Sequence, residues 1–369
     1  MINEPLRVVI AGGGTGGHLF PGIAVARELL SRAPAAIVTF AGTADGIEAR
    51  VMPREGFSLD VIRSSGLKGK GWAGRIGGAV RLPFSLVDAW CVISRRRPHV
   101  VIGVGGYSSG PTVLVAALRR VPTMLLEQNA VPGLTNRLLS HVVRAAAVTY
   151  DSTKAFFGGQ AFVSGNPVRA EFLGGAQAST AVAAPATRPG VGVLVFGGSQ
   201  GAHAINLAMV EAAARLATSG IMLRVTHQTG ERDLDIVRTA YRAAGCDADV
   251  EPFLYDMARR LVETDLVVCR AGATTLAEIA AAGKPAILIP LPTATDDHQR
   301  RNAEALGATG AAEVLLQSDA DGATLAARIV ALAGDPARRA AMSAAVRRQA
   351  RPDAARLIVD KVLELARAR

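Results

Sequence analysis

Three glycine-rich turns of this chain have the residue types that bind phosphate groups. Residues 12–18 read GGGTGGH, residues 103–111 read GVGGYSSGP and residues 197–201 read GGSQG. Each turn follows an apolar run. Glycine lets the backbone come close to a phosphate, and the start of the next helix offers unpaired N–H groups and the positive end of its dipole. Three such turns exceed what one dinucleotide needs, so they indicate two diphosphate ligands.

The first turn alone also fits the pattern G-x-G-x-x-G of nicotinamide-dependent oxidoreductases. That interpretation expects an acidic residue at the end of the second strand, where it would bind the ribose. Here the second expected strand runs into Thr43, and Asp45 falls later, in the loop. This weakens the nicotinamide interpretation without removing it. For any single turn, a plain strand-to-helix connection is the alternative.

Two titratable side chains beside such turns could carry chemistry. His18 closes the first turn, and its imidazole titrates near neutral pH, so it is a candidate general base. The alternative, of equal weight, is that His18 orients the turn or an acceptor phosphate. Glu278 could accept hydrogen bonds from the ribose hydroxyls of a nucleotide, or it could form a capping box with Thr275. His203, after the third turn, is expected to start a helix.

The elements that must position these residues follow a repeated order of strand, turn and helix. The chain has 369 residues, which is about right for two domains. Apolar runs predict strands at 6–11, 36–41, 99–104, 122–127, 145–149, 160–164, 191–196, 221–226, 249–253, 265–269, 286–291 and 311–316. Helical stretches rich in Ala, Leu and Arg alternate with them. This alternation predicts an α/β fold of two parallel sheets with helices on both faces.

The chain also repeats itself. Residues 8–18 (VVIAGGGTGGH) and 193–203 (VLVFGGSQGAH) are both an apolar strand, a glycine-rich turn and a helix start. The repeat predicts two Rossmann-like, doubly wound domains that face each other across a cleft. We expect domains at 1–166 and 167–349, with the polar loop 174–190 near the boundary.

A final amphipathic helix is expected from about 350 to 369. Its apolar positions are Ala355, Leu357, Ile358, Val362 and Leu365. A terminal helix can pack back across a domain boundary, so we expect this one to join the first domain.

The net charge of +10 comes entirely from the N-terminal half of the chain. Residues 1–169 hold 19 Lys and Arg against 9 Asp and Glu, whereas residues 170–369 hold 22 of each. This asymmetry indicates an anionic partner for the first half. Nucleic acid is not expected, because aromatic residues are few and no recognised nucleic-acid motif is present.

The stretch 63–97 has the composition of a membrane-surface site. It holds eight basic residues, one acid and both tryptophans, a mixture typical of sites that bind an anionic bilayer surface. The predicted membrane face comprises Lys68, Lys70, Trp72, Arg75, Ile76, Val80, Arg81 and Phe84. The alternative is an ordinary core helix with a solvated basic face. No apolar run approaches the roughly 20 residues that span a bilayer, and no signal peptide precedes the first strand.

Together the motifs resemble one family. They are 12–22 (GGGTGGHLFPG), 66–71 (GLKGKG), 103–111 (GVGGYSSGP), 125–137 (LLEQNAVPGLTNR), 165–169 (GNPVR), 197–202 (GGSQGA), 269–290 (CRAGATTLAEIAAAGKPAILIP) and DHQ with NA in 297–303. They resemble the MurG family, bacterial UDP-N-acetylglucosamine:undecaprenyl-diphosphoryl-muramyl-pentapeptide N-acetylglucosaminyltransferases. The resemblance extends from about Arg7 to past Asn302.

This resemblance implies a GT-B fold and an inverting transfer of N-acetylglucosamine that needs no metal and no cofactor. The muramyl 4-hydroxyl of the lipid-linked acceptor would displace UDP and form a β-1,4 link in peptidoglycan biosynthesis. The first domain would serve the acceptor and an anionic membrane surface, and the second would bind UDP-N-acetylglucosamine. The implied location is the cytoplasmic face of the inner membrane, as a peripheral protein.

The family's contacts to the transferred sugar map onto matching positions here. Thr15, Gly16 and Gly17 would lie beside the sugar, and Asn129 would hold one of its hydroxyls. Gln299 would reach the far hydroxyls. Backbone help would come from Ala273, Thr274 and Thr275.

The contacts to the two diphosphates map in the same way. Arg169 and Ser199 would face the UDP diphosphate. Leu254 would border the uracil, and Glu278 would take the ribose. The residues assigned to the acceptor diphosphate are Gly13, Gly14, Gly105, Gly106, Tyr107 and Ser108. One departure is His298, which stands where the family commonly has glutamine.

No metal site is predicted, although many glycosyltransferases hold a metal with Asp-x-Asp. That pattern occurs at 247–249 and at 319–321, and we interpret both as solvated turns in polar loops. Two other functions remain as alternatives. One is another GT-B enzyme, such as a UDP-N-acetylglucosamine 2-epimerase or a transferase to a soluble acceptor. The other is a non-catalytic module that binds a nucleotide sugar or a phospholipid.

Overall fold

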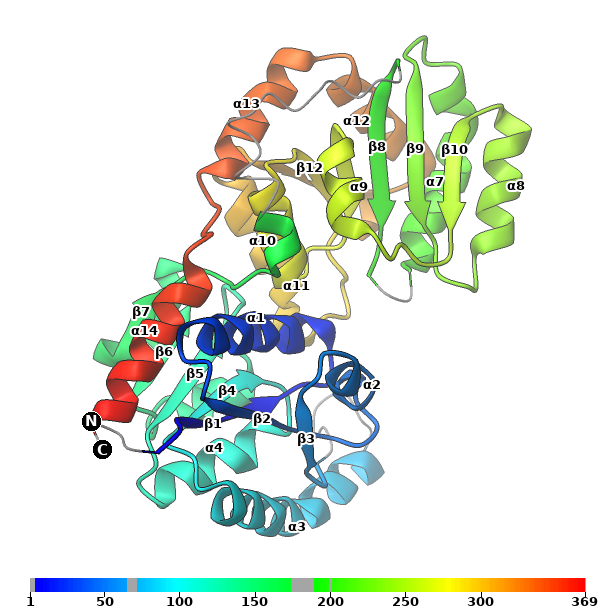
Figure 1. Cartoon of the computed structure of the whole chain (residues 1–369). Helices are drawn as coiled ribbons and strands as arrows, with labels where there is room; N and C mark the ends of the chain where they lie inside the picture. Colours follow the sequence, from blue (N-terminus) through cyan, green and yellow to red (C-terminus); the bar gives the residue numbers. More distant parts are fainter. Residues whose placement is uncertain (1–3, 65–71, 174–188, 199–200, 369) are drawn as a thin grey trace. The chain divides into compact units, whose positions relative to one another are not determined.

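The computed structural model describes residues 4–64, 72–173, 189–198 and 201–368, and describes 72–81 by their backbone. These residues form two compact units (Figure 1). The first comprises Met1–Arg169 with Arg351–Arg369, and the second comprises Ala170–Ala350.

The first unit is built on a parallel seven-stranded sheet in the order β3-β2-β1-β4-β5-β6-β7. Its strands are β1 (Arg7–Gly12), β2 (Ile37–Gly42), β3 (Ser58–Val61), β4 (Val100–Gly105), β5 (Thr123–Glu127), β6 (Ala145–Val148) and β7 (Ala161–Val163). Sequence analysis predicted all of them except β3. This edge strand was missed because it is short, reads SLDV and contains an acid. Asp60 is buried and forms ion pairs with Arg95 and Arg96.

Alternate residues of these strands enter two separate cores, one on each face of the sheet. Val8 and Ile10 of β1 pack with α1 (Gly16–Arg32), α2 (Ile47–Arg54) and α14 (Ala354–Arg367). Val9 and Ala11 pack with α3 (Trp72–Arg96), α4 (Ser109–Leu118) and α5 (Leu134–Leu139). Two short 3-10 helices, η1 (Asp151–Phe156) and η2 (Gly158–Gln160), precede β7.

The C-terminal helix α14 belongs to the first unit and packs beside α1 (Figure 1). Ile358, Val362 and Leu365 are buried in the core, and Arg32 of α1 pairs with Asp360 at 2.7 Å. The other two expected apolar positions are only half-buried, because the buried stripe passes through Ala354 and Val359 instead.

The second unit is built on a parallel six-stranded sheet in the order β10-β9-β8-β11-β12-β13. Its strands are β8 (Val191–Phe196), β9 (Leu223–Gln228), β10 (Asp247–Glu251), β11 (Leu266–Cys269), β12 (Ala286–Leu288) and β13 (Ala312–Val314). Its helices are α7 (His203–Ala217), α8 (Leu234–Ala244), α9 (Met257–Glu263), α10 (Ala273–Ala282), α11 (His298–Gly307), α12 (Gly322–Ala333) and α13 (Pro336–Arg347), with 3-10 helices η3 (Thr295–Asp297) and η4 (Gln317–Asp319). The core on one face joins the sheet to α7, α8 and α12.

Each sheet reverses its strand order next to its first strand. The reversal lies between β1 and β4 in the first unit and between β8 and β11 in the second. In doubly wound sheets, ligands bind outside the carboxyl ends of the strands at such switch points. The predicted α/β fold class of two doubly wound parallel sheets is confirmed, and the glycine-rich turns lie at both switch points.

Candidate active site

The first two glycine-rich turns touch each other at the switch point of the first unit. Gly13 donates its N–H to the carbonyl of Gly105 at 3.3 Å. A Cβ atom on Gly106 would stand 2.5 Å from the Gly13 carbonyl oxygen, and one on Gly12 would stand 2.3 Å from that of Gly105. The two turns therefore form one surface, and only glycine permits their approach.

Glu48, in the first turn of α2, binds the backbone of the first glycine-rich turn through its carboxylate. Its side chain is fully buried and accepts a hydrogen bond of 2.8 Å from the N–H of Gly14. It also accepts from the N–H and the hydroxyl of Thr43, both at 2.8 Å. A Cβ atom on Gly13 would stand 2.5 Å from this carboxylate. Glu48 was not predicted from the sequence: the nicotinamide interpretation expects an acid at the end of the second strand, and Asp45 falls in the loop beyond it.

These contacts restrict how Gly13 and Gly14 could bind a phosphate. Both of their N–H groups are donated inside the protein, to Gly105 and Glu48. A diphosphate on this surface would instead take hydrogen bonds from the starts of α1 and α4, where the first N–H groups lack helical partners. Of the predicted residues before α4, Tyr107 is 46% exposed whereas Ser108 is buried.

His18 is the third residue of α1, and its ring lies against the second glycine-rich turn. Thr15, the N-cap of α1, places its hydroxyl 3.3 Å from His18 Nδ1. A Cβ atom on Gly105 would stand 2.8 Å from His18 Cδ2 and 3.0 Å from Nε2. The structure thus brings together Thr15, Gly16, Gly17 and His18 with the turn at Gly105. This placement suits a proton acceptor and a positioning role equally.

Asn129 is oriented by a buried glutamate at the end of β5. Glu127 accepts hydrogen bonds from the N–H and the side-chain amide of Asn129, at 3.0 and 3.1 Å, and from the amide of Asn136 at 2.8 Å. Burial raises the pKa of Glu127. Asn129 was predicted from the sequence, but Glu127, which orients the Asn129 amide, was not.

Arg169 ends the first unit and lies beside the same surface. Its guanidinium is 4.7 Å from the centre of the Phe20 ring, a cation–π distance. Phe20 in turn lies against Gly16, where a Cβ atom would stand 2.9 Å from the ring. The structure therefore groups Arg169 with the start of α1; its contact with the UDP diphosphate stays a prediction.

In the second unit, Gln228 connects two of the predicted donor elements. At the end of β9, its amide donates to the Gly198 carbonyl at 2.6 Å and accepts from the Leu254 N–H at 3.0 Å. Leu254 is only 3% exposed, and its contact with a uracil stays a prediction. Gln228 was missed because nothing in its local sequence marks it. Ser199 lies outside the described residues.

Buried polar side chains hold the loops after β11 and β12 together. Arg270 donates to the carbonyls of Ile289 and Pro290 at 3.0 and 3.2 Å, and burial lowers its pKa. Asn302 donates to the carbonyl of Ala271 at 3.4 Å. The side-chain carbonyl oxygen of Gln299 accepts a hydrogen bond from the N–H of Leu291 at 3.0 Å, so this oxygen already has a donor.

The capping-box interpretation of Glu278 is wrong. Helix α10 begins at Ala273 with Gly272 as its N-cap, so Thr275 and Glu278 both lie inside the helix. Ala273, Thr274 and Thr275 form its first turn, whose N–H groups can receive an anion. Glu278 is 8% exposed, and its ribose contact stays a prediction.

The histidines of the second unit have structural partners. His203 starts α7, as expected, and its Nδ1 is 2.9 Å from Asp233, which also accepts from Asn206. His227 is fully buried between Asn206 and Tyr241, and burial lowers its pKa to about 3. His298, the departure from the family pattern, bonds the Thr295 carbonyl at 2.6 Å.

One of the two Asp-x-Asp segments is not in a loop. Asp247 and Asp249 open strand β10, and Asp249 pairs with Arg260 at 2.6 Å. Asp321 is the N-cap of α12 and accepts from the Thr324 N–H at 2.7 Å. Within the described part of the chain, no group of three or more His, Cys, Asp and Glu side chains is placed to hold a metal ion.

The predicted membrane face is only partly described. Lys68 and Lys70 lie outside the described residues, and so do the side chains of Trp72, Arg75, Ile76, Val80 and Arg81 on α3. Phe84 is 50% exposed, and Val87 and Trp90 of the same helix are similarly exposed. Among the helices searched in the described ranges, none is long and apolar enough to cross a bilayer.

Two family models match the chain. One, described as the glycosyltransferase family 28 N-terminal domain, matches residues 8–148, and the other, the C-terminal domain of the same family, matches residues 192–358. A relative from Pelobacter propionicus is 48% identical over 97% of this chain and 99% of its own length. A relative from an Anaeromyxobacter species is 46% identical over 99% of this chain and 94% of its own. Both are named UDP-N-acetylglucosamine–N-acetylmuramyl-(pentapeptide) pyrophosphoryl-undecaprenol N-acetylglucosamine transferase.

Solved structures show the same likeness. The crystal structure of Acinetobacter baumannii MurG has a TM-score of 0.79 and 30% identity, covering 98% of this chain and all of that one. A UDP-GlcNAc 2-epimerase from Neisseria meningitidis has a TM-score of 0.68 at 14% identity, covering 97% of this chain and 100% of that one. The second likeness shows the fold alone. Together they confirm the expected GT-B class.

Proposed function

The chain belongs to the MurG family within glycosyltransferase family 28, and we propose that it moves N-acetylglucosamine from UDP to an undecaprenyl-diphosphate-linked muramyl-pentapeptide. The observation that carries this proposal is the 48% identity over 97% of the chain to a transferase so named. The site supports it, because the predicted residues follow the carboxyl ends of neighbouring strands at both switch points.

The chemistry is a displacement at the anomeric carbon of the sugar. The bond from that carbon to the UDP oxygen breaks, and a bond to the muramyl 4-oxygen forms. UDP leaves with the bonding electrons, so negative charge grows on its diphosphate. We assign the stabilisation of this charge to Arg169, Ser199 and the first N–H groups of α10. The attacking hydroxyl loses its proton, and we assign His18 to accept it.

Turnover of labelled UDP-N-acetylglucosamine with a short-chain lipid acceptor tests the proposal. We expect label on the acceptor and release of UDP, at a rate that excess EDTA leaves unchanged. Formation of an epimerised UDP-sugar without acceptor would instead indicate an epimerase. Binding without turnover would indicate a non-catalytic module. Activity lost in EDTA and restored by magnesium or manganese would overturn the metal-independent mechanism.

We also propose that the basic and apolar stretch from Lys68 to Phe84 meets the cytoplasmic face of the plasma membrane. The acceptor carries a long lipid that cannot leave the bilayer, so the enzyme must come to it. Exposed Phe84, Val87 and Trp90 on α3 support an interfacial surface there.

A further inference from the structure

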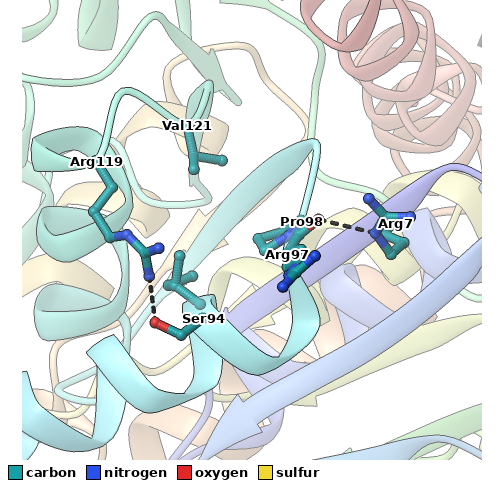
Figure 2. A pocket seen from close by; sticks show the side chains of 7 residues that line it. Arg7, Ser94, Arg97, Pro98, Arg119 and Val121 are labelled. Carbon is teal, nitrogen blue, oxygen red and sulfur yellow. Dashed lines mark hydrogen bonds between the residues drawn. The ribbon is translucent and has the colours of Figure 1, made fainter.

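A pocket of about 420 Å³ opens at the edge of the first unit where the strands begin (Figure 2). Arg7 starts β1, Pro98 precedes β4 and Val121 precedes β5, so this edge is opposite to the carboxyl ends that carry the predicted active site. The lining residues are Arg7, Ile93, Ser94, Arg97, Pro98, Arg119 and Val121. Three of them are arginines and none is acidic, although the proposed transfer uses none of them.

Two of the arginines are held in place on different sides of the pocket (Figure 2). Arg119 donates to the Ser94 hydroxyl at 2.7 Å, and its guanidinium lies 4.6 Å from the centre of the Trp90 ring. Arg7 donates from Nε to the carbonyl of Arg97 at 2.9 Å and pairs outside the pocket with the exposed Glu4. The Arg97 guanidinium makes no hydrogen bond or ion pair to any residue in the described ranges.

Two arginines stand at the C-terminal ends of helices in left-handed backbone conformations. Arg97 follows α3 with φ 44°, and Arg120 follows α4 with φ 59°. Both φ values are left-handed, and after Arg120 the Val121 N–H donates to the Ala116 carbonyl, a bond that closes α4. Glycine normally occupies that position because it has no Cβ atom to strain. Arg97, which lines the pocket, therefore has a backbone conformation that glycine would adopt more easily, whereas Arg120 is not among the lining residues.

The pocket continues an exposed apolar face of α3. Val87, Trp90 and Ser94 recur at helical spacing on one face of α3, and Arg97 follows directly after the helix. Val87 is 57% and Trp90 54% exposed. A ligand with a phosphate in the pocket could therefore lay an apolar part along Trp90 and Val87.

We propose that this pocket binds the phosphate of an anionic phospholipid. Forked guanidinium groups match phosphate oxygens, and the lining supplies three of them, of which Arg7 also pairs with Glu4. Free phosphate offers the same anion, but only a lipid would use the neighbouring apolar face. The proposal that the bound anion belongs to a lipid rests on the proposed membrane face. The proposal that the pocket binds an anion does not.

The test measures binding of soluble dihexanoyl phosphatidylglycerol, with dihexanoyl phosphatidylcholine and inorganic phosphate as comparison ligands. The pocket variant is Arg97→Gln/Arg119→Gln. The matched control, Arg95→Gln/Arg120→Gln, removes the same charge outside the pocket, and Asp60 keeps Arg96 as its partner. We expect the pocket variant to bind phosphatidylglycerol about 25-fold more weakly than parent and control, at about fivefold per arginine. The single variant Arg97→Gln, which breaks no observed contact of its side chain, should lose about fivefold with an unchanged circular dichroism spectrum.

Equal binding by the pocket variant and the control would overturn the site. Inorganic phosphate that binds as tightly as phosphatidylglycerol would overturn the lipid source. Transfer to a water-soluble acceptor, measured with the same variants, should equal that of the parent because the pocket is at the opposite sheet edge. Absence of transfer in the parent would count against the proposed function and leave the binding result unaffected.

Discussion

The buried carboxylate of Glu48 accepts a hydrogen bond of 2.8 Å from the backbone N–H of Gly14, a residue 34 positions earlier in the chain. The same carboxylate holds Thr43 at the end of β2. The shape of the first glycine-rich turn therefore depends on α2 as well as on its own glycines. This turn carries Thr15 and His18 at the start of α1, so Glu48 acts on the site through backbone position.

Replacing Glu48 by alanine should misplace this turn. Three donors would lose a buried acceptor, and we expect the free energy of unfolding to fall by about 2–3 kcal/mol. A small displacement of the turn should lower kcat/KM for the acceptor by up to about 10²-fold. Denaturant unfolding and steady-state kinetics measure both effects. Asp45→Ala, in the exposed part of the same loop, is the control and should change neither. Normal kinetics in a folded Glu48→Ala variant would show that the turn holds itself.

An alanine at Gly105 should act on His18. The new Cβ atom would stand 2.8 Å from the imidazole, at a backbone φ of 97° that favours glycine. We expect kcat to fall toward the roughly 10²–10⁴-fold loss expected of His18→Ala if His18 accepts the proton. Calorimetric affinity for UDP should stay unchanged. The control is Gly133→Ala, where a Cβ atom meets nothing within 4 Å. If His18→Ala raises only the acceptor KM and leaves the saturated rate intact, His18 is a positioning residue.

Replacing Glu278 by alanine should weaken binding of the UDP donor. Glu278 lies inside α10, whose N-cap is Gly272, so Glu278→Ala keeps the N-cap residue of that helix. We expect UDP to bind more weakly by about 1–3 kcal/mol, the scale of hydrogen bonds to a charged group. Isothermal titration of UDP measures this, with Glu263→Ala on the exposed side of α9 as the control. Unchanged UDP affinity in the folded variant would remove Glu278 from the ribose site.

Stability should fall in mild acid because of His227. Burial lowers the pKa of His227 to about 3 from an ordinary value of 6.5. Between these values the unfolded chain binds a proton that the folded chain does not, so this contribution is complete above pH 6.5 and is lost as pH falls toward 3. The slope attributable to His227 is at most about 1.4 kcal/mol per pH unit. Denaturant unfolding from pH 7 to 5 should show a shallower slope in His227→Gln than in His141→Gln, the same change at an exposed histidine. Equal slopes would show that the buried imidazole does not drive the effect.

The sequence predicted the strands and turns because their signals are local. Apolar runs marked all strands but β3, and glycine marked the turns that the structure brings together at Gly13 and Gly105. It missed Glu48, Glu127 and Gln228, because each is defined by partners that only the folded chain brings close. It misassigned the segment of Asp247 and Asp249 for a related reason: Arg260 pairs with Asp249 in β10, and a single sequence does not show that pairing.

The membrane prediction combines two forces that respond differently to salt. Each basic residue near an anionic bilayer contributes about 1 kcal/mol, and salt screens that attraction. Apolar residues such as Phe84 add a part that salt does not screen. Binding of the parent to anionic vesicles should therefore fall at high salt without vanishing.

Replacing Lys68, Lys70, Arg75 and Arg81 by glutamine should abolish most of this vesicle binding, measured by flotation. Turnover of a water-soluble acceptor analogue should stay nearly intact, because none of these residues is among those assigned to the donor site. The matched control removes four exposed arginines of the second unit, Arg215, Arg232, Arg242 and Arg301, and should bind vesicles like the parent. A quadruple variant that binds as well as its control would show that this stretch is not the membrane face. The basic excess of residues 1–169 would then require a different anionic partner.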